Sequence, residues 1–208
     1  MKKIIDISWP VSQATTGYKD KNIVEFREIR HFAKDGFYET AFCLSSHTGT
    51  HVDAPSHFIK DGASIDQLDL KTVIGDCRVL DVTTALEKIT GEVLENQKIE
   101  TGDIILLKTA NSLKTATEKF TPHFVYLDVT GAEYLVGKKV KAVGIDYLGI
   151  EHSQKDHVTH TTLMKKNITI IEGLRLGHVK AGNYMLICLP LLMVGLEAAP
   201  ARAVLVEE

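Results

Sequence analysis

Short apolar segments rich in β-branched residues recur along the chain and predict strands. They cover residues 3–8, 22–29, 38–45, 77–82, 103–109, 124–129, 141–146, 168–174 and 184–191. Three of them, 103–109, 124–129 and 141–146, are apolar almost throughout, which is typical of strands covered on both faces of a sheet. The pattern predicts a strand-rich chain.

Helical patterns are fewer and lie between these strands, at Thr90–Gln97, Thr130–Val136 and Ser153–Lys166. Thr90 is a candidate N-cap, and Gly137 is expected to end the second helix. Ser153 begins an S-x-x-D capping pattern, and Asn167 can close the last helix in a left-handed conformation. The order of elements predicts the α/β class.

Two acidic residues, Asp128 and Asp146, stand at the ends of predicted strands. Ligands of open α/β sheets gather beyond the carboxyl ends of strands, so both residues are candidates for a place near a site. The alternative, which we favour, is that each side chain caps a turn.

The polar stretch "SSHTGTHVDAPSHF", residues 45–58, stands out from this pattern. Its glycine, β-branched residues and prolines disfavour a helix and favour an extended strand leading into a turn. Side chains alternate along a strand, so His47, Gly49, His51 and Asp53 should share one face. Gly49 would then leave room for an ion or a substrate, and His57 could fold back over the same pocket after the turn.

Two imidazoles and a carboxylate form the ligand set of a catalytic zinc site, and the same atoms also suit manganese or iron. Three protein ligands leave a position open for water. Cys43 has the right parity but is too far along the chain to be included as a ligand.

A second cluster lies farther along the chain. On the helix predicted from Ser153, His157 and His160 share a face, and either could point at a site. In the next strand, Glu172 shares a face with Ile170, and a buried carboxylate requires a partner. A cation and a salt bridge to Arg175 remain equally open.

Composition narrows the function classes. The 208 residues fit one domain, 1–208, with 44% hydrophobic and 25% charged residues. A net charge of −3 with interspersed signs disfavours nucleic acid as a partner. The three scattered cysteines indicate reduced thiols, not a disulfide framework.

No export signal is expected, because the first apolar run is broken at Asp6. The longest apolar run, Tyr184–Leu196, contains Pro190 and is too short to span a bilayer. We therefore expect a cytoplasmic protein without a membrane partner.

The motif "HTGTHVDAPSHF" matches every fixed position of the pattern H-x-G-T-H-x-D-x-P-x-H. In this motif the chain resembles the cyclase-like metal hydrolases, which include bacterial kynurenine formamidase and isatin hydrolase. The resemblance continues through "TGDIILLKT", "AVGIDYLGIE", "HTTLM" and "ITIIEGLRLGHVKAGNYMLICLPL". It implies a swivelling β/β/α-type fold, with a mixed sheet partly closed into a barrel and flanked by helices, and a homodimer or larger assembly such as a tetramer.

The resemblance also implies roles for individual residues. His47, His51 and Asp53 would bind a divalent metal, zinc or manganese, and His160 and Glu172 would complete a centre of one or two ions. It selects His160 over His157. The remaining histidine of the motif, His57, would be the catalytic acid/base.

One segment departs from the family pattern. Kynurenine formamidases carry a Trp-Pro-Gly segment in an early loop that helps to hold the aryl substrate, whereas this chain has "TTGYKDKNIVEF". Tyr18 can replace the tryptophan as a substrate contact, but Lys19 and Asp20 stand where the family has Pro-Gly. Phe37 is a further candidate for substrate contact, with packing as the preferred alternative.

These observations predict a metal-dependent hydrolase of amide-type C–N bonds. The expected substrate is an aryl formamide such as N-formylkynurenine, an intermediate of tryptophan catabolism. One alternative is hydrolysis of a lactam ring, as in isatin hydrolase, or another cyclase-family reaction. Another is a non-catalytic, metal-dependent binding protein, against which the presence of His57 counts, since binding alone requires no proton shuttle.

Overall fold

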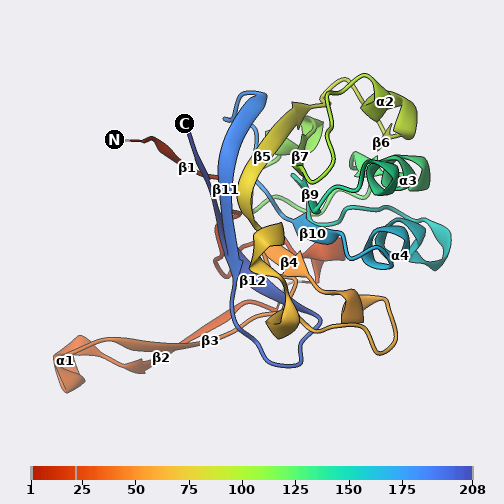
Figure 1. Ribbon diagram of the computed structural model, residues 1–208. Helices are drawn as coiled ribbons and strands as arrows, with labels where there is room; N and C mark the ends of the chain where they lie inside the picture. The colour runs from red at the N-terminus through yellow and green to blue at the C-terminus, as the bar shows by residue number, and fades with distance from the viewer. Residues whose placement is uncertain (1, 22, 208) are drawn as a thin grey trace.

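The computed structural model describes residues 2–21 and 23–207 and has a mixed sheet at its centre (Figure 1). Seven strands close into a ring in the order β12-β11-β5-β7-β9-β10-β4, because β12 pairs with β4 as well as with β11, and β1 is added to β12. The strands are β1 (Ile4–Asp6), β4 (His51–Asp53), β5 (Ile74–Asp81), β7 (Ile104–Lys108), β9 (Ala142–Ile145), β10 (Thr169–Glu172), β11 (Gly182–Pro190) and β12 (Ala198–Val206). The closed mixed sheet that the resemblance implied is confirmed.

Strands β5, β7, β9 and β10 run parallel, and the remaining pairs of the ring are antiparallel. Parallel neighbours need crossover connections, and three helices lie on these connections, on one side of the barrel (Figure 1). These helices are α2 (Gly91–Glu95), α3 (Val129–Lys138) and α4 (Val158–Met164). A two-stranded sheet of β6 (Lys88–Ile89) and β8 (Tyr126–Leu127) lies on the same connections.

Alternation along the strands separates two cores. In β7, Ile104 and Leu106 belong to the core inside the barrel, whereas Ile105 and Leu107 belong to the core between the sheet and the helices. All four side chains are fully buried, which confirms the prediction of a strand covered on both faces. Residues of β4 and β10 that point away from the barrel interior therefore face the layer that contains α4.

The helix ends differ in part from the expected ones. Thr90 caps α2 as predicted, and Asp128 caps α3 by accepting from the backbone N–H of Gly131. Gly137 does not end α3, which continues to Lys138 and is closed by Lys139 in a left-handed conformation.

Ser153 does not cap α4. The chain forms a short 3-10 turn at Lys155–His157, and α4 begins only after His157, because His157 itself has a left-handed backbone. Asn167 has the left-handed conformation expected after this helix.

The strands differ from the predicted ones in two places. The segment 124–129 forms only the two-residue strand β8, since Asp128 already begins the capping of α3. Strand β12 was not predicted, because its alanines and Pro200 weaken the β signal, yet it pairs with three neighbours.

Residues 25–43 form an arm that projects from the barrel (Figure 1). It consists of β2 (Glu25–Arg30), the single helical turn α1 (Phe32–Asp35) and β3 (Glu39–Cys43), with β2 and β3 paired antiparallel. Six large apolar side chains of the arm are between 43% and 66% exposed: Phe26, Ile29, Phe32, Phe37, Tyr38 and Phe42.

Among the described residues, no helix combines the length and the apolar character needed to cross a bilayer.

Candidate metal centre

The centre is built on β4 and β10, which pair antiparallel. His51 lies directly opposite Glu172, and Asp53 lies opposite Ile170. Val52, between the two polar residues of β4, belongs to the barrel core, so His51 and Asp53 point outward together. Nε2 of His51 lies 3.3 Å from Oε2 of Glu172 and 3.6 Å from Oδ1 of Asp53.

His47 joins this pair by a turn and not by an extended strand, which corrects our expectation. Strand β4 begins only at His51, and residues 46–50 form turns and bends. The turn brings Nδ1 of His47 to 3.1 Å from Oδ1 of Asp53. The prediction that His47, His51 and Asp53 converge is therefore correct, although alternation accounts only for the last two.

Gly49 also serves a different purpose from the one predicted. Its φ is +63°, a left-handed conformation that favours glycine, and a Cβ there would lie 3.0 Å from Val11 and 3.2 Å from the carbonyl oxygen of Trp9. The space beside Gly49 is occupied by the N-terminal segment. Gly49 thus allows close packing of the turn and does not make room for an ion.

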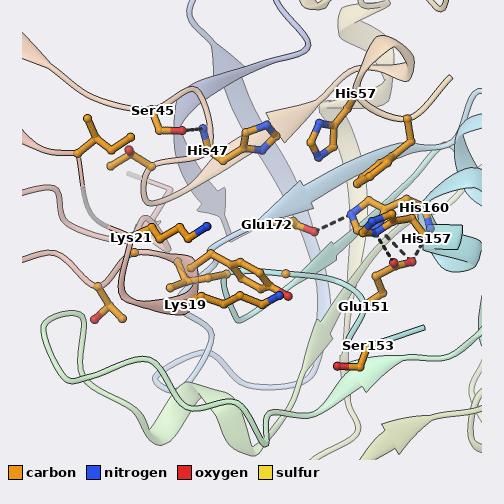
Figure 2. Close-up of a pocket in the computed structure, with 18 of the residues that line it drawn as sticks. Lys19, Lys21, Ser45, His47, His57, Glu151, Ser153, His157, His160 and Glu172 are labelled. Atoms are coloured by element: carbon orange, nitrogen blue, oxygen red, sulfur yellow. Dashed lines mark hydrogen bonds and ion pairs between the residues drawn. The ribbon is translucent and has the colours of Figure 1, made fainter. Parts of the chain in front are cut away.

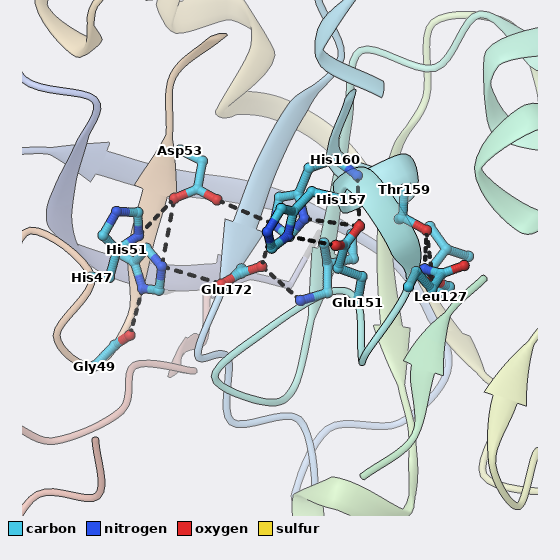
Figure 3. A network of polar contacts seen from close by, with 12 residues as sticks. His47, Gly49, His51, Asp53, Leu127, Glu151, His157, Thr159, His160 and Glu172 are labelled. Atoms are coloured by element: carbon cyan, nitrogen blue, oxygen red, sulfur yellow. Dashed lines mark hydrogen bonds and ion pairs between the residues drawn. The ribbon is translucent and has the colours of Figure 1, made fainter. Parts of the chain in front are cut away.

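Helix α4 contributes His160 from the other side of the centre (Figure 3). Its Nε2 lies 3.2 Å from Oε1 of Glu172 and 3.8 Å from Oδ2 of Asp53. The other ring nitrogen, Nδ1, lies 3.2 Å from Oε2 of Glu151, which also accepts from the backbone N–H of His160 at 3.1 Å. Glu151 therefore holds both the start of the helix and the imidazole, while His157 pairs with the other oxygen of Glu151 at 2.9 Å.

Glu172 has no ion pair with Arg175, which was one of the two open alternatives. Its carboxylate faces His51 and His160 and accepts from the backbone N–H of Ile150 at 2.6 Å. Arg175 instead stacks over the ring of Trp9, 4.7 Å from its centroid. The geometry favours the alternative in which Glu172 faces a cation site.

The carboxylates dominate the electrostatics. Burial by itself lowers the pKa of His51 and His160, but the neighbouring carboxylates, above all Glu172 for His51 and Glu151 and Glu172 for His160, raise these pKa values to about 9 and about 10. Burial raises the pKa of Glu172, but the two histidines hold it well below its ordinary value. The carboxylates thus create a negative potential at the centre that attracts positive charge, either protons on the histidines or a cation.

Unsatisfied polar atoms indicate what kind of positive charge fits. Both carboxylate oxygens of Asp53 and Nε2 of His51 are buried and make no hydrogen bond among the described residues. A buried carboxylate without hydrogen bonds costs roughly several kcal/mol, and a bound cation would offset this cost. His51, Asp53 and Glu172 offer one atom each within 4.8 Å of one another, as do His47, Asp53 and His57. This nitrogen and oxygen donor set fits a divalent metal ion.

A cavity of about 470 Å³ opens beside the centre (Figure 2). His57 lines it, with its ring centroid 4.3 Å from that of His47. Burial lowers the pKa of His57, so its imidazole is neutral near pH 7 and can accept a proton. Tyr18 lies in the cavity wall as predicted, whereas Phe37 lies on the arm and does not line the cavity.

Two carboxylates near the centre were missed by the sequence analysis. Glu151 directly follows the largely apolar segment 142–150 and precedes His152, and an acidic residue beside a histidine at the end of a buried segment was a usable signal. Glu197, whose Oε1 lies 3.4 Å from Nε2 of His47, stands 150 positions from that histidine, and no local signal connects them. Asp128 and Asp146 act within the fold and not at the cavity, since both accept hydrogen bonds from nearby turns.

Comparisons with known proteins agree with a metal centre. Residues 5–152 match a protein family described as "Putative cyclase". A kynurenine formamidase of Bacillus anthracis is 31% identical over 205 residues, which cover 98% of this chain and 97% of the relative. A solved structure described as a potential metal-dependent hydrolase with cyclase activity is 36% identical and has a TM-score of 0.91. The match covers 100% of this chain and 99% of that structure's chain. An isatin hydrolase is 23% identical with a TM-score of 0.86, covering 99% of this chain and 92% of its own, which shows a shared fold.

Proposed function

The chain belongs to the putative cyclase family, and from this premise we propose that it is a metal-dependent hydrolase of amide-type C–N bonds, acting on aryl formamides. The observation that carries the proposal is the buried group formed by His51, Asp53 and Glu172, whose unsatisfied atoms fit a divalent cation and which lies beside a cavity of substrate size. The relationship to a kynurenine formamidase over almost the whole chain supports the choice of substrate class.

We assign His47, His51 and Asp53 as metal ligands, with His160 and Glu172 completing a centre of one or two ions. Zinc is our first choice of metal and manganese the second, because imidazole and carboxylate suit both. A bound divalent cation supplies Lewis-acid polarisation of a carbonyl and lowers the pKa of water towards about 7.

His57 is the residue that moves protons in this proposal. It lines the cavity, faces the centre and is neutral near pH 7, so it can take a proton from the attacking water. The water oxygen bonds to the carbonyl carbon, the C–N bond breaks, and His57 returns the proton to the leaving nitrogen. Tyr18 and Phe58 form part of the wall against which an aryl group would pack.

The test separates metal binding from proton transfer. The protein is reconstituted with zinc or manganese, and hydrolysis of N-formylkynurenine and of isatin is measured together with metal content. His51→Ala should lose metal, whereas His57→Ala should keep metal and lose roughly 10²–10⁴-fold in kcat. His152→Ala is the matched control, because His152 packs on Phe124 and Tyr126 outside the cavity.

Each result has a defined meaning. Selective turnover of isatin would replace the formamidase assignment by lactam hydrolysis. Full turnover by His57→Ala with full metal content would refute the acid/base role. Substoichiometric metal in the parent protein, with no hydrolysis of formamides, lactams or esters, would favour a metal-dependent binding protein.

We also propose that the arm makes the protein a homodimer or a larger homo-oligomer. A two-stranded hairpin alone is only marginally stable in water, and this arm exposes six large apolar side chains. A second apolar surface lies in the β11–β12 connection, where Leu192 and Val194 are 79% and 80% exposed. Reciprocal contact between two copies would cover both surfaces, as symmetric dimers do.

Light scattering after size-exclusion chromatography tests this assembly. Phe26→Ser combined with Phe42→Ser removes an exposed cross-strand pair of the arm and should yield a monomer at micromolar concentration. The double variant Lys34→Ser and Lys60→Ser, which changes two exposed charged residues, is the control. A parent protein that is monomeric at high concentration would contradict the proposal.

A further inference from the structure

The cavity wall opposite the metal centre carries two lysines. Lys19 and Lys21 line the cavity, and Figure 2 shows their ammonium ends turned towards the side on which Glu172, Glu151 and His160 lie. Both belong to the segment at residues 15–21, which also contributes Tyr18 to the cavity wall.

The backbone that carries these lysines is anchored to a second segment. The hydroxyl of Thr16 donates to the carbonyl oxygens of Ala116 and Glu118, at 3.0 Å and 2.6 Å. Asp20 accepts from the backbone N–H of Phe120 at 2.8 Å. The ring of Tyr18 packs edge-to-face on Phe120 at 4.9 Å. The lysines thus extend from a fixed wall of the cavity.

The backbone conformation supports a functional reading of this wall. Lys19 and Asp20 have φ values of 54° and 57°, in the left-handed region that side-chain-bearing residues rarely adopt. Each such residue costs about 1 kcal/mol and persists only where its surroundings impose it, most often at functional sites. Here the conformation places Lys19 on the cavity side of the segment.

The two lysines have no carboxylate partner in the described parts of the chain. Nζ of Lys19 lies over the ring of Tyr18, 5.3 Å from its centroid, and neither ammonium group forms an ion pair with a described carboxylate. Asp20, between them, is engaged by Phe120, while Glu151 and Glu172 across the cavity are engaged by histidines. Two ammonium groups that face one cavity and have no carboxylate partner among the described residues are complementary to an anionic ligand.

The remaining wall fits an aromatic ring. Tyr18, Ile23, Phe58 and Leu148 line the same cavity, whose volume of about 470 Å³ falls in the range of small-molecule sites, roughly 300–1,000 Å³. A ring on this wall can hold one substituent near the metal centre and another near the lysines.

We propose that Lys19 and Lys21 form an anion subsite, and that the substrate of this chain is an aryl amide that carries a carboxylate. The inference rests on the proposed hydrolase function and narrows its substrate class. The scissile amide lies on the side of His47, Asp53 and His57, and the carboxylate lies on the side of Lys19 and Lys21. The ammonium groups hold the carboxylate by charge-assisted hydrogen bonds.

A matched pair of substrates tests the subsite. 4-Formamidobenzoate and formanilide share the formamide and the ring and differ in the carboxylate, which lies across the ring from the formamide. With the metal-reconstituted protein, the ratio of their kcat/KM values should favour the anionic substrate. Lys19→Met combined with Lys21→Met should lower this ratio at least about tenfold, the effect of losing one hydrogen bond to a charged group.

Three further variants make the result specific. Lys19→Arg combined with Lys21→Arg should keep most of the preference, because the charge is retained. Lys19→Glu should lower the ratio below that of the methionine variant by repulsion. Lys165→Met, an exposed lysine next to α4 that does not line the cavity, should leave the ratio at its parental value. A ratio that is the same in the parent and the methionine variant overturns the proposal.

A binding measurement separates this proposal from the hydrolase assignment. Calorimetric titration of the metal-loaded protein with 4-aminobenzoate and with aniline requires no turnover. Preferred binding of 4-aminobenzoate, lost in the methionine variant, supports the subsite even if neither formamide is hydrolysed, in which case the hydrolase proposal fails alone. Equal affinity for 4-aminobenzoate and aniline in the parent, or equal 4-aminobenzoate affinity in the parent and the methionine variant, overturns the subsite.

Discussion

Replacing Gly173 by alanine should loosen the metal centre through a backbone contact. Gly173 follows Glu172, has a φ of +68° and packs against the turn between His47 and His51. A Cβ built at this position would lie 2.2 Å from the carbonyl oxygen of Gly49 and 2.7 Å from its carbonyl carbon, whereas ordinary contacts begin at 3.4 Å. The turn and β10 must therefore separate by about 1 Å.

The size of the effect follows from two contributions. A left-handed alanine costs about 1–2 kcal/mol, and relief of a backbone overlap brings the total to roughly 3 kcal/mol. For a chain of this size that corresponds to a decrease of about 6–12 °C in Tm. Displacing the turn that carries His47 should also weaken metal binding by roughly 10–100-fold, as loss of support for a ligand does.

Zinc affinity can be measured by competition with a chromophoric chelator, and Tm by calorimetry of the metal-free and metal-loaded protein. Gly102→Ala is the matched control, because Gly102 has a φ of +85° but a Cβ there would contact only Cε of Lys141, at 3.8 Å. It should lose stability without losing zinc affinity. If Gly173→Ala behaves like Gly102→Ala in both measurements, the contact between Gly49 and Gly173 does not position the ligands.

Three further predictions concern Glu151, the bound metal and the buried Asp146. Glu151→Gln should lower zinc affinity by roughly 10–100-fold, because the amide cannot provide the charge that orients His160. The control Glu133→Gln, at an exposed position of α3, should not change zinc affinity. Chelation of a metal present at a thousandfold excess over Kd should cost about 4 kcal/mol, seen as a loss of roughly 8–16 °C in Tm. Burial raises the pKa of Asp146 from 3.8 to about 6, although Ser112 and Thr109 donate hydrogen bonds to its carboxylate. The folded state therefore favours the protonated carboxyl. The stabilisation that this gives is fully present below pH 3.8 and is lost as the pH rises through 6. Relative to Asp146→Asn, the unfolding free energy of the metal-free parent should therefore fall by about 1 kcal/mol between pH 5 and pH 7, and a constant difference between the two proteins would contradict this pKa.

Local patterns predicted those parts of the site that depend on neighbours in sequence. Alternation along β4 correctly placed His51 and Asp53 on one face, because both lie within the same strand. It failed for His47, since the turn at residues 46–50 is imposed by Gly49 packing against the N-terminal segment, a contact between residues 40 positions apart. Composition alone does not reveal such a contact.

The same distinction explains the fold predictions. Strands β7 and β9 were identified because burial on both faces leaves a continuous apolar signature. Strand β12 was missed because its place is secured by pairing with β11 and with β1 and β4, the last two distant in sequence, and not by its own propensity. Glu197, which follows the β11–β12 loop and reaches His47, was missed for the same reason.

The location of the centre connects metal binding to closure of the barrel. Strand β4 closes the ring, with β10 on one side and β12 on the other, yet it has only three residues. Two of these, His51 and Asp53, face the centre, where the nearest charged neighbours include the carboxylate of Glu172 on β10. Without a cation, protons on His51 and His160 supply the positive charge that these two carboxylates need, which is why the pKa values of both imidazoles are raised. A cation held between β4, β10 and α4 would take the place of these protons and link the closing strands, so the site that we propose for catalysis is also the place where a bound ion would stabilise the closed barrel.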